Sequence, residues 1–280
     1  MASDSPVAVI TGGASGMGLA LAEDLAQKNW NVAVLDINDK GGKALEGKFT
    51  GKVSYFRANV VDYEAQAAAF ESVWNSWGRL DFVWANAGIG DRIPYLDPPA
   101  KLDGNSPPKP DVLVIDVDLY GAVYSSYLAL FYFRKNKTGA GKLVMTSSTA
   151  GLYPNIALPL YGAAKHGVVG LARNMALILE ARKEPIEINC ICPGLVKTGI
   201  PAKEMFDIFP AEHVTPMDTI LHCMNQFIEE DLNGRVMECS GPNINRVDAP
   251  DYSDEHSRFL NHTFPINMTF LAANAMDEHT

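Results

Sequence analysis

Cysteine is scarce in this chain of 280 residues, and positive charge is in the minority. The four cysteines include no Cys-x-x-Cys pair, which argues against a disulfide framework and a zinc site, so we predict that no metal is bound. A formal net charge of -10 disfavours nucleic acid and anionic membranes as partners. The N-terminus lacks a basic segment followed by a long apolar run, so we predict no signal peptide or membrane span and expect a cytoplasmic location.

The remaining composition is that of an ordinary globular protein, with enough length for one large core. Short apolar runs alternate with longer amphipathic stretches, as in a parallel sheet with helices on both faces. About seven strands are predicted, at 7–11, 32–36, 53–58, 81–85, 142–147, 186–192 and 235–240. Helices are predicted at 16–28, 63–77, 113–134 and 161–181. The pattern predicts a single-domain α/β fold, a doubly wound, Rossmann-like parallel sheet.

The regular alternation is interrupted in three places. Residues 91–111 hold six prolines and predict a long loop. Residues 199–216 are expected to form either a lid over the substrate or a plain surface helix. We place the catalytic domain at 1–242 and expect the polar tail, 243–280, either to be loosely ordered or to lie at a subunit interface.

A glycine-rich turn, Thr11-Gly12-Gly13-Ala14-Ser15-Gly16-Met17-Gly18, follows the first predicted strand and opens the first predicted helix. The glycines permit a tight turn, a close approach of a pyrophosphate and close packing of helix on strand. The helix N-terminus supplies N–H groups for the phosphates. A glycine run is a weak signal alone, but this context predicts a dinucleotide site.

The choice of dinucleotide depends on Asp36, which ends the second predicted strand. Its carboxylate can accept hydrogen bonds from the adenosine ribose hydroxyls, and it would repel a 2′-phosphate. Neither Ile37 nor Met17 is a cation that could neutralise such a phosphate. The sequence therefore predicts NAD as the cofactor, although Asp36 could instead only cap its strand.

Tyr161 and Lys165 lie one turn apart at the start of a predicted helix. A phenol ordinarily holds its proton up to about pH 10, and a nearby ammonium favours the phenolate, which is a useful base. The preceding predicted strand ends at the carboxyl edge of the sheet with Ser147 and Ser148. A serine hydroxyl there can donate to a substrate oxygen that gains negative charge, while the other serine only forms a turn.

Taken together, these motifs resemble the short-chain dehydrogenase/reductase family in its simple single-domain form. The similarity runs from about residue 7 to residue 240. Besides the turn and Asp36, it includes Asn86-Ala87-Gly88, Ser148 thirteen residues before Tyr161, Lys165, and Pro193-Gly194-Leu195-Val196-Lys197-Thr198. Residues 161–170, 191–196 and 231–234 are similar to 15-hydroxyprostaglandin dehydrogenase-like members.

The resemblance implies a role for each matching residue. Tyr161 is expected to be the general acid/base, Ser148 to orient the substrate oxygen, and Lys165 to hold the nicotinamide ribose. The cofactor contacts that it implies are Gly12, Ser15, Gly16, Met17, Gly18, Asp36, Asn59, Val60, Asn86, Ala87, Gly88, Tyr161, Lys165, Pro193, Gly194, Val196 and Thr198. Helix 113–134 commonly pairs subunits in the family, which implies a homodimer or homotetramer.

Two departures from the family pattern matter. Asp118 occupies the position of an asparagine that helps hold a water in a proton relay to the lysine. A carboxylate there could still hold the water, but it would alter the charge beside Lys165. Residues 156–160 are wholly apolar just before Tyr161, which indicates a substrate other than a prostaglandin.

The leading hypothesis is reversible hydride transfer between NAD and a secondary alcohol or ketone on a small apolar substrate. One alternative is an NAD-binding but weakly active regulator or scaffold, motivated by Asp118. Another is a sugar-nucleotide epimerase or dehydratase, which shares the Tyr-x-x-x-Lys pair. Such enzymes need a sizeable C-terminal substrate domain, and only 40 residues follow the last predicted strand.

Overall fold

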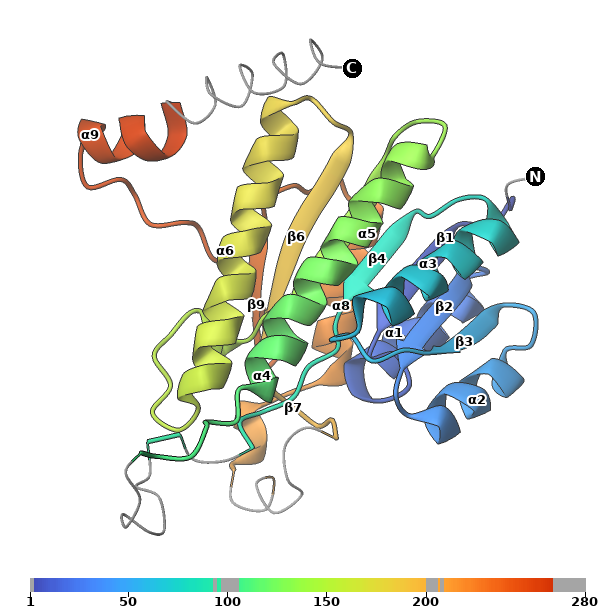
Figure 1. Ribbon diagram of the computed structural model, residues 1–280, viewed down its shortest axis with the longest axis horizontal. Helices are drawn as coiled ribbons and strands as arrows, with labels where there is room; N and C mark the ends of the chain where they lie inside the picture. Colours follow the sequence, from blue (N-terminus) through green and yellow to red (C-terminus); the bar gives the residue numbers. More distant parts are fainter. Residues whose placement is uncertain (1–2, 93–94, 97–105, 200–205, 207–208, 264–280) are drawn as a thin grey trace.

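The computed structural model describes residues 3–92, 95–96, 106–199, 206 and 209–263. Its centre is an eight-stranded sheet in the order β10-β9-β6-β5-β4-β1-β2-β3 (Figure 1). All neighbours in this sheet pair in parallel except β10, which runs antiparallel to β9. The strands are β1 (Val7–Thr11), β2 (Asn31–Asp36), β3 (Val53–Arg57), β4 (Phe82–Ala85), β5 (Gly141–Thr146), β6 (Ile186–Pro193), β9 (Val236–Ser240) and β10 (Asn243–Arg246). The single-domain, doubly wound α/β prediction is confirmed.

The count of about seven strands is one too low. The additional strand, β10, lies in the segment that the sequence predicted as a polar tail, and its residues pair with Met237 to Ser240 of β9. An edge strand tolerates polar side chains because one side of it faces solvent. The sequence Asn-Ile-Asn-Arg therefore gives little apolar alternation by which to recognise it.

Helices cover both faces of the sheet (Figure 1). On one face α1 (Gly16–Gln27), α2 (Asp39–Lys48) and α8 (Met217–Glu229) bury side chains such as Leu21, Leu45 and Phe227. On the other, α3 (Tyr63–Trp77), α5 (Gly121–Lys135) and α6 (Pro159–Ala181) bury side chains such as Phe70 and Phe133. The predictions did not include α2 and α8.

The helix predicted at 113–134 has three parts. It begins with α4 (Leu113–Ile115), widens to a π-helix in η1 (Asp116–Tyr120) and continues as α5. Among the described residues, this helix is long and apolar enough to cross a membrane by length and composition alone. It packs against β4 and β5, and a helix that packs in the core of a protein has the same apolar composition. Single-turn π segments often occur at functional sites, and this one contains the buried Asp118.

The two irregular segments after β6 are described only in part. Much of the predicted lid, 199–216, lies outside the described residues. Its final part forms the 3₁₀ turn η3 (Ala211–His213) and the short strand β8 (Val214–Thr215), which pairs with β7 (Leu195–Val196). Beyond β10, a short helix α9 (Glu255–Arg258) is followed by a π turn, η4 (Phe259–Thr263). Whether this tail lies at a subunit interface stays a prediction.

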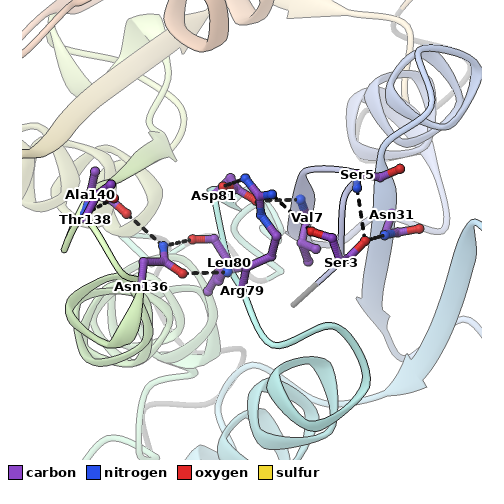
Figure 2. A network of polar contacts seen from close by, with 10 residues as sticks. All are labelled: Ser3, Ser5, Val7, Asn31, Arg79, Leu80, Asp81, Asn136, Thr138 and Ala140. Atoms are coloured by element: carbon purple, nitrogen blue, oxygen red, sulfur yellow. Dashed lines mark hydrogen bonds and ion pairs between the residues drawn. The ribbon is translucent and has the colours of Figure 1, made fainter. Parts of the chain in front are cut away.

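A network of polar contacts ties the N-terminal segment to the amino edge of the sheet (Figure 2). The Asp81 carboxylate accepts hydrogen bonds from the backbone N–H of Val7 at 2.7 Å and from the Arg79 guanidinium at 2.7 and 2.9 Å. Nearby, the Asn136 amide pairs with the backbone N–H and carbonyl of Leu80. This network holds the start of β1 against β4, at the opposite edge from the glycine turn.

We expect Asp81→Ala to lower the free energy of unfolding by about 2 kcal/mol, because the buried N–H of Val7 loses its acceptor. Urea unfolding of the purified protein measures this loss. Asp248 provides a matched control, because it pairs with Arg246 at the same two-residue spacing but is 71% exposed. Asp248→Ala should cost less than about 0.5 kcal/mol. Equal losses for the two variants would contradict this account.

Candidate active site

The carboxyl ends of β1 and β4 meet where the strand order reverses, which is where doubly wound sheets bind ligands. A cavity of about 290 Å³ opens there. The structure brings together in its wall most of the predicted cofactor contacts: Gly12, Ser15, Gly16, Met17, Asp36, Asn59, Val60, Asn86, Ala87, Gly88 and Thr198. Leu35, Ile37, Ala58, Ile89, Val117 and Gly199 also line it and were not predicted.

The glycine turn packs closely against its neighbours only because it lacks side chains. A Cβ on Gly12, whose φ is +65°, would lie 2.8 Å from the Cα of Ala87. A Cβ on Gly18 would lie 2.3 Å from the carbonyl oxygen of Gly12, so Gly18 serves the packing of α1 against the turn. Ser15 precedes α1 in an extended conformation without a side-chain capping bond among the described residues. This bare helix N-terminus beside a cavity fits a pyrophosphate.

Asp36 is held firmly at the end of β2. Its Oδ2 accepts a hydrogen bond from Ala14 N–H and its Oδ1 accepts one from Asn38 N–H, both at 2.9 Å. The carboxylate therefore connects the glycine turn to the turn after β2 while it lines the cavity. A charged acceptor fixed in this way fits a ribose diol.

Arg57 is a cation near Asp36 that the residues next to Asp36 in the sequence did not reveal. It lies opposite Asp36 in the register of β2 and β3. Its guanidinium forms an ion pair with Asp39, and Asp39 also accepts a hydrogen bond from the Tyr55 hydroxyl at 2.9 Å. The hydroxyl of Tyr55 and the charge of Arg57 both lower the Asp39 pKa. Arg57 is therefore already paired with a carboxylate.

Thr11 organises the floor of the cavity, although the sequence did not single out its side chain. Its Oγ1 accepts hydrogen bonds from the backbone N–H groups of Asn86 and Ala87, at 3.0 and 3.1 Å. In return, Asn86 Nδ2 donates to the carbonyl of Thr11 at 3.1 Å. These contacts lock the end of β4 against the glycine turn. Asn59 is exposed at the adjoining rim, where its Oδ1 accepts from Val61 N–H.

Lys165 is buried at the centre of the second half of the site. Its Nζ donates to the carbonyl of Thr146 at 2.9 Å and lies 3.1 Å from Asp118 Oδ2. It also lies 5.5 Å from the centre of the Tyr161 ring. Burial disfavours the charged amine, but the Asp118 carboxylate and the other nearby groups together outweigh this effect, so the Lys165 pKa is raised. The charged form of the lysine is thus favoured in its pair with Asp118, beside Tyr161.

Tyr161 lies in the first turn of α6, half-buried beside the described part of the loop after β4. Asp91, from that loop, accepts hydrogen bonds from the backbone N–H groups of Leu160 at 3.3 Å and Tyr161 at 2.8 Å. The first N–H groups of a helix have no partner within the helix, and a carboxylate there also favours the helix dipole. Asp91 thus fixes the turn that carries Tyr161. No sequence motif marked it, because it is 70 residues away.

We expect Asp91→Ala to cost about 1 kcal/mol of stability, as loss of a capping side chain does, and to lower turnover because the first turn of α6 loosens. Urea unfolding and steady-state kinetics measure the two effects. Asp91→Asn is the control, because its amide oxygen can still accept from Tyr161 N–H, and it should restore most of both. If Asp91→Ala changes neither property, Asp91 does not position the turn.

The two serines after β5 have different positions. Ser147 is buried and its hydroxyl donates to the carbonyl of Lys165 at 2.8 Å, which fastens β5 to α6. Ser148 precedes the 3₁₀ turn η2 (Thr149–Gly151), and its Oγ accepts from Ala150 N–H at 3.2 Å and contacts the carbonyl of Pro193 at 3.4 Å. The Ser147 hydroxyl is thereby committed to the fold.

The remaining predicted contacts lie beside this second half of the site, away from the wall of the 290 Å³ cavity. Pro193 meets Ser148 at the end of β6, Gly194 N–H donates to the carbonyl of Cys239 at 2.8 Å, and Val196 is buried in β7. Within the described part of the chain, no cluster of three or more His, Cys, Asp and Glu side chains could hold a metal ion.

The sequence of this chain is similar to those of known proteins. A family model described as short chain dehydrogenase matches residues 6–206. The chain is 41% identical over 219 residues to the short-chain dehydrogenase/reductase prx7 of Penicillium rubens, across 76% of this chain and 77% of that one. It is 32% identical over 200 residues to the 15-hydroxyprostaglandin dehydrogenase (NAD(+)) of Homo sapiens, across 69% of each.

A solved structure with the same fold is the NADPH-dependent 3-quinuclidinone reductase from Rhodotorula rubra. The TM-score is 0.71 at 23% identity, over 86% of this chain and 92% of that chain. At that identity the likeness shows the fold alone.

Proposed function

The chain belongs to the short-chain dehydrogenase/reductase family of oxidoreductases, and from this premise we propose that it transfers hydride reversibly between NAD and a secondary alcohol or ketone. The observation that carries the proposal is the buried Lys165 ammonium, held 5.5 Å from the Tyr161 ring beside a cavity that fits a dinucleotide. Burial of a charged amine is costly, and here the buried carboxylate of Asp118 offsets that cost.

Each of the three polar side chains of the site has its own role in the reaction. In the oxidative direction, the phenolate of Tyr161, which the Lys165 ammonium stabilises, takes the proton of the substrate hydroxyl and becomes a neutral phenol. Ser148 donates a hydrogen bond to the substrate oxygen. The nicotinamide ring, when bound, supplies the hydride acceptor. In the reductive direction, Tyr161 returns the proton to the same oxygen.

Two features support NAD over NADP. Asp36 places a fixed carboxylate in the cavity wall, and Arg57 is occupied by Asp39. The relatives do not decide the matter, because one is named for NAD(+) and a structural neighbour for NADPH. The choice therefore follows from the charges of this chain.

The surface around Tyr161 supports an apolar substrate. Exposed large apolar side chains occur on the loops that follow three neighbouring strands, β4, β5 and β6. They are Tyr95, Leu96, Tyr153, Ile156 and Phe209. These loops follow the carboxyl ends of parallel strands, which is the edge of the sheet at which α6 begins (Figure 1). Apolar groups gathered around a site favour an apolar ligand over a charged one.

A second exposed apolar surface supports a homodimer or homotetramer. Tyr120, Tyr127 and Phe131 are exposed along one stripe of η1 and α5. Such a stripe on a surface helix favours burial against another subunit. Light scattering of the purified protein tests this, and a monomer at micromolar concentration would contradict it.

The test of the proposed function is formation of reduced cofactor from a panel of hydrophobic secondary alcohols, with NAD or NADP, and the reverse reaction with ketones. We expect turnover with NAD and little with NADP. Dinucleotide binding without turnover of any compound would favour the weakly active regulator or scaffold instead. Tighter NAD binding in the presence of a sugar nucleotide would favour an epimerase or dehydratase.

A further inference from the structure

The carboxylate of Asp118 is sealed inside the active site. The Asp118 side chain is fully buried and that of Lys165 is 3% exposed, with their charged atoms 3.1 Å apart. The backbone of Gly88 closes over them, since a Cβ there would lie 3.2 Å from Asp118 Oδ2 and 3.3 Å from Lys165 Nζ. Two opposite charges in so little solvent interact strongly, because water cannot screen them.

The surrounding backbone keeps the pair in place. Ile89 N–H donates to Asp118 Oδ1 at 2.8 Å, so the carboxylate is held from the side opposite Lys165. The carbonyl of Thr146 holds the ammonium. The titratable and charged groups that act on the pair come from four elements: Asp118 on η1, Tyr161 and Lys165 on α6, Cys190 on β6, and Asp91 on the loop after β4.

We propose that Asp118 sets the pH range of this site by offsetting the charge of Lys165, so that Tyr161 loses its proton at higher pH than it would beside an uncompensated lysine. This inference rests on the proposed function, in which Tyr161 is the base. An ammonium alone favours the phenolate strongly, whereas an ammonium paired with a carboxylate presents a dipole with no net charge. Asp118 is thus a positioning and charge-setting residue that acts through Lys165.

The test is the pH profile of alcohol oxidation by Asp118→Asn. Asparagine keeps the size of the side chain and its acceptor for Ile89 N–H but removes the charge. We expect the midpoint of the rate to move to lower pH by about one unit, the smaller end of the effect of one nearby charge. Asp116→Asn is the matched control, because it removes a carboxylate from the same π segment without a contact to Lys165 among the described residues.

A second measurement needs no turnover. The ultraviolet absorbance of the unaltered protein is measured against pH, and subtraction of the same curve for Tyr161→Phe gives the phenolate absorbance of Tyr161. The same subtraction is then made for the pair of proteins that carry Asn in place of Asp118. We expect this absorbance to appear at lower pH in the Asn background. An unchanged midpoint, or a shift to higher pH, overturns the proposal. If the unaltered protein oxidises no alcohol, the proposed function fails, while the absorbance titration still decides the role of Asp118.

Discussion

Tyr161→Phe should lower the turnover number by roughly a thousandfold and leave dinucleotide binding almost unchanged. The substitution removes only the hydroxyl, so the aromatic ring that faces the Lys165 ammonium remains. The backbone contact between Asp91 and residue 161 is also kept, because it uses the N–H group. Steady-state kinetics and a titration of cofactor binding separate the two effects.

Tyr63→Phe is the matched control for this experiment. Tyr63 is also a half-buried tyrosine near the start of a helix, but its ring packs against Tyr124 and not beside the active-site lysine. We expect that variant to keep the activity of the unaltered protein. If Tyr161→Phe retains most of its turnover, another group moves the proton and the assignment is wrong.

Asp36→Asn should shrink the preference for NAD over NADP by roughly a hundredfold in kcat/KM, about 2.7 kcal/mol. Removal of the charge relieves the repulsion of a 2′-phosphate, and a neutral amide accepts ribose hydrogen bonds more weakly. Some loss of activity with NAD is also expected, because one of the two backbone N–H groups that Asp36 now binds would face the amide NH₂.

The ratio of kcat/KM for the two cofactors is the measurement, because it cancels a general loss of stability. Glu64→Gln is the control, since it removes an exposed carboxylate from the first turn of α3 without a role in the cavity. It should leave the ratio unchanged. An unchanged ratio in Asp36→Asn would show that this carboxylate does not select the cofactor.

The sheet was predictable because its central strands are short and mostly buried and apolar, and β1 and β4 are buried throughout. The glycine turn and the helix after it were predictable because their pattern lies in consecutive residues. The helix α8 was missed although Ile220, Cys223, Met224 and Phe227 give it a clear buried stripe. The helix α2 was harder, because its three glycines and several lysines hide a face that buries little beyond Leu45.

The site was predictable where its residues end a strand, as Asp36 does, or lie just after one, as Asn86 and Ser148 do. It was not predictable where distant segments meet. Asp91 reaches the start of α6 from a proline-rich loop, and Arg57 reaches the region of Asp36 from the neighbouring strand. Sequence spacing carries no signal for such contacts, because the loop path and the strand register create them.

The most direct test of hydride transfer uses a secondary alcohol that the protein oxidises, prepared with deuterium on its carbinol carbon. After oxidation by NAD, mass spectrometry of the reduced cofactor reports where the deuterium has gone. The account predicts that each reduced cofactor carries the deuterium of one alcohol, with none released to water. Reduced cofactor without deuterium, or deuterium found in the solvent, would contradict the central claim.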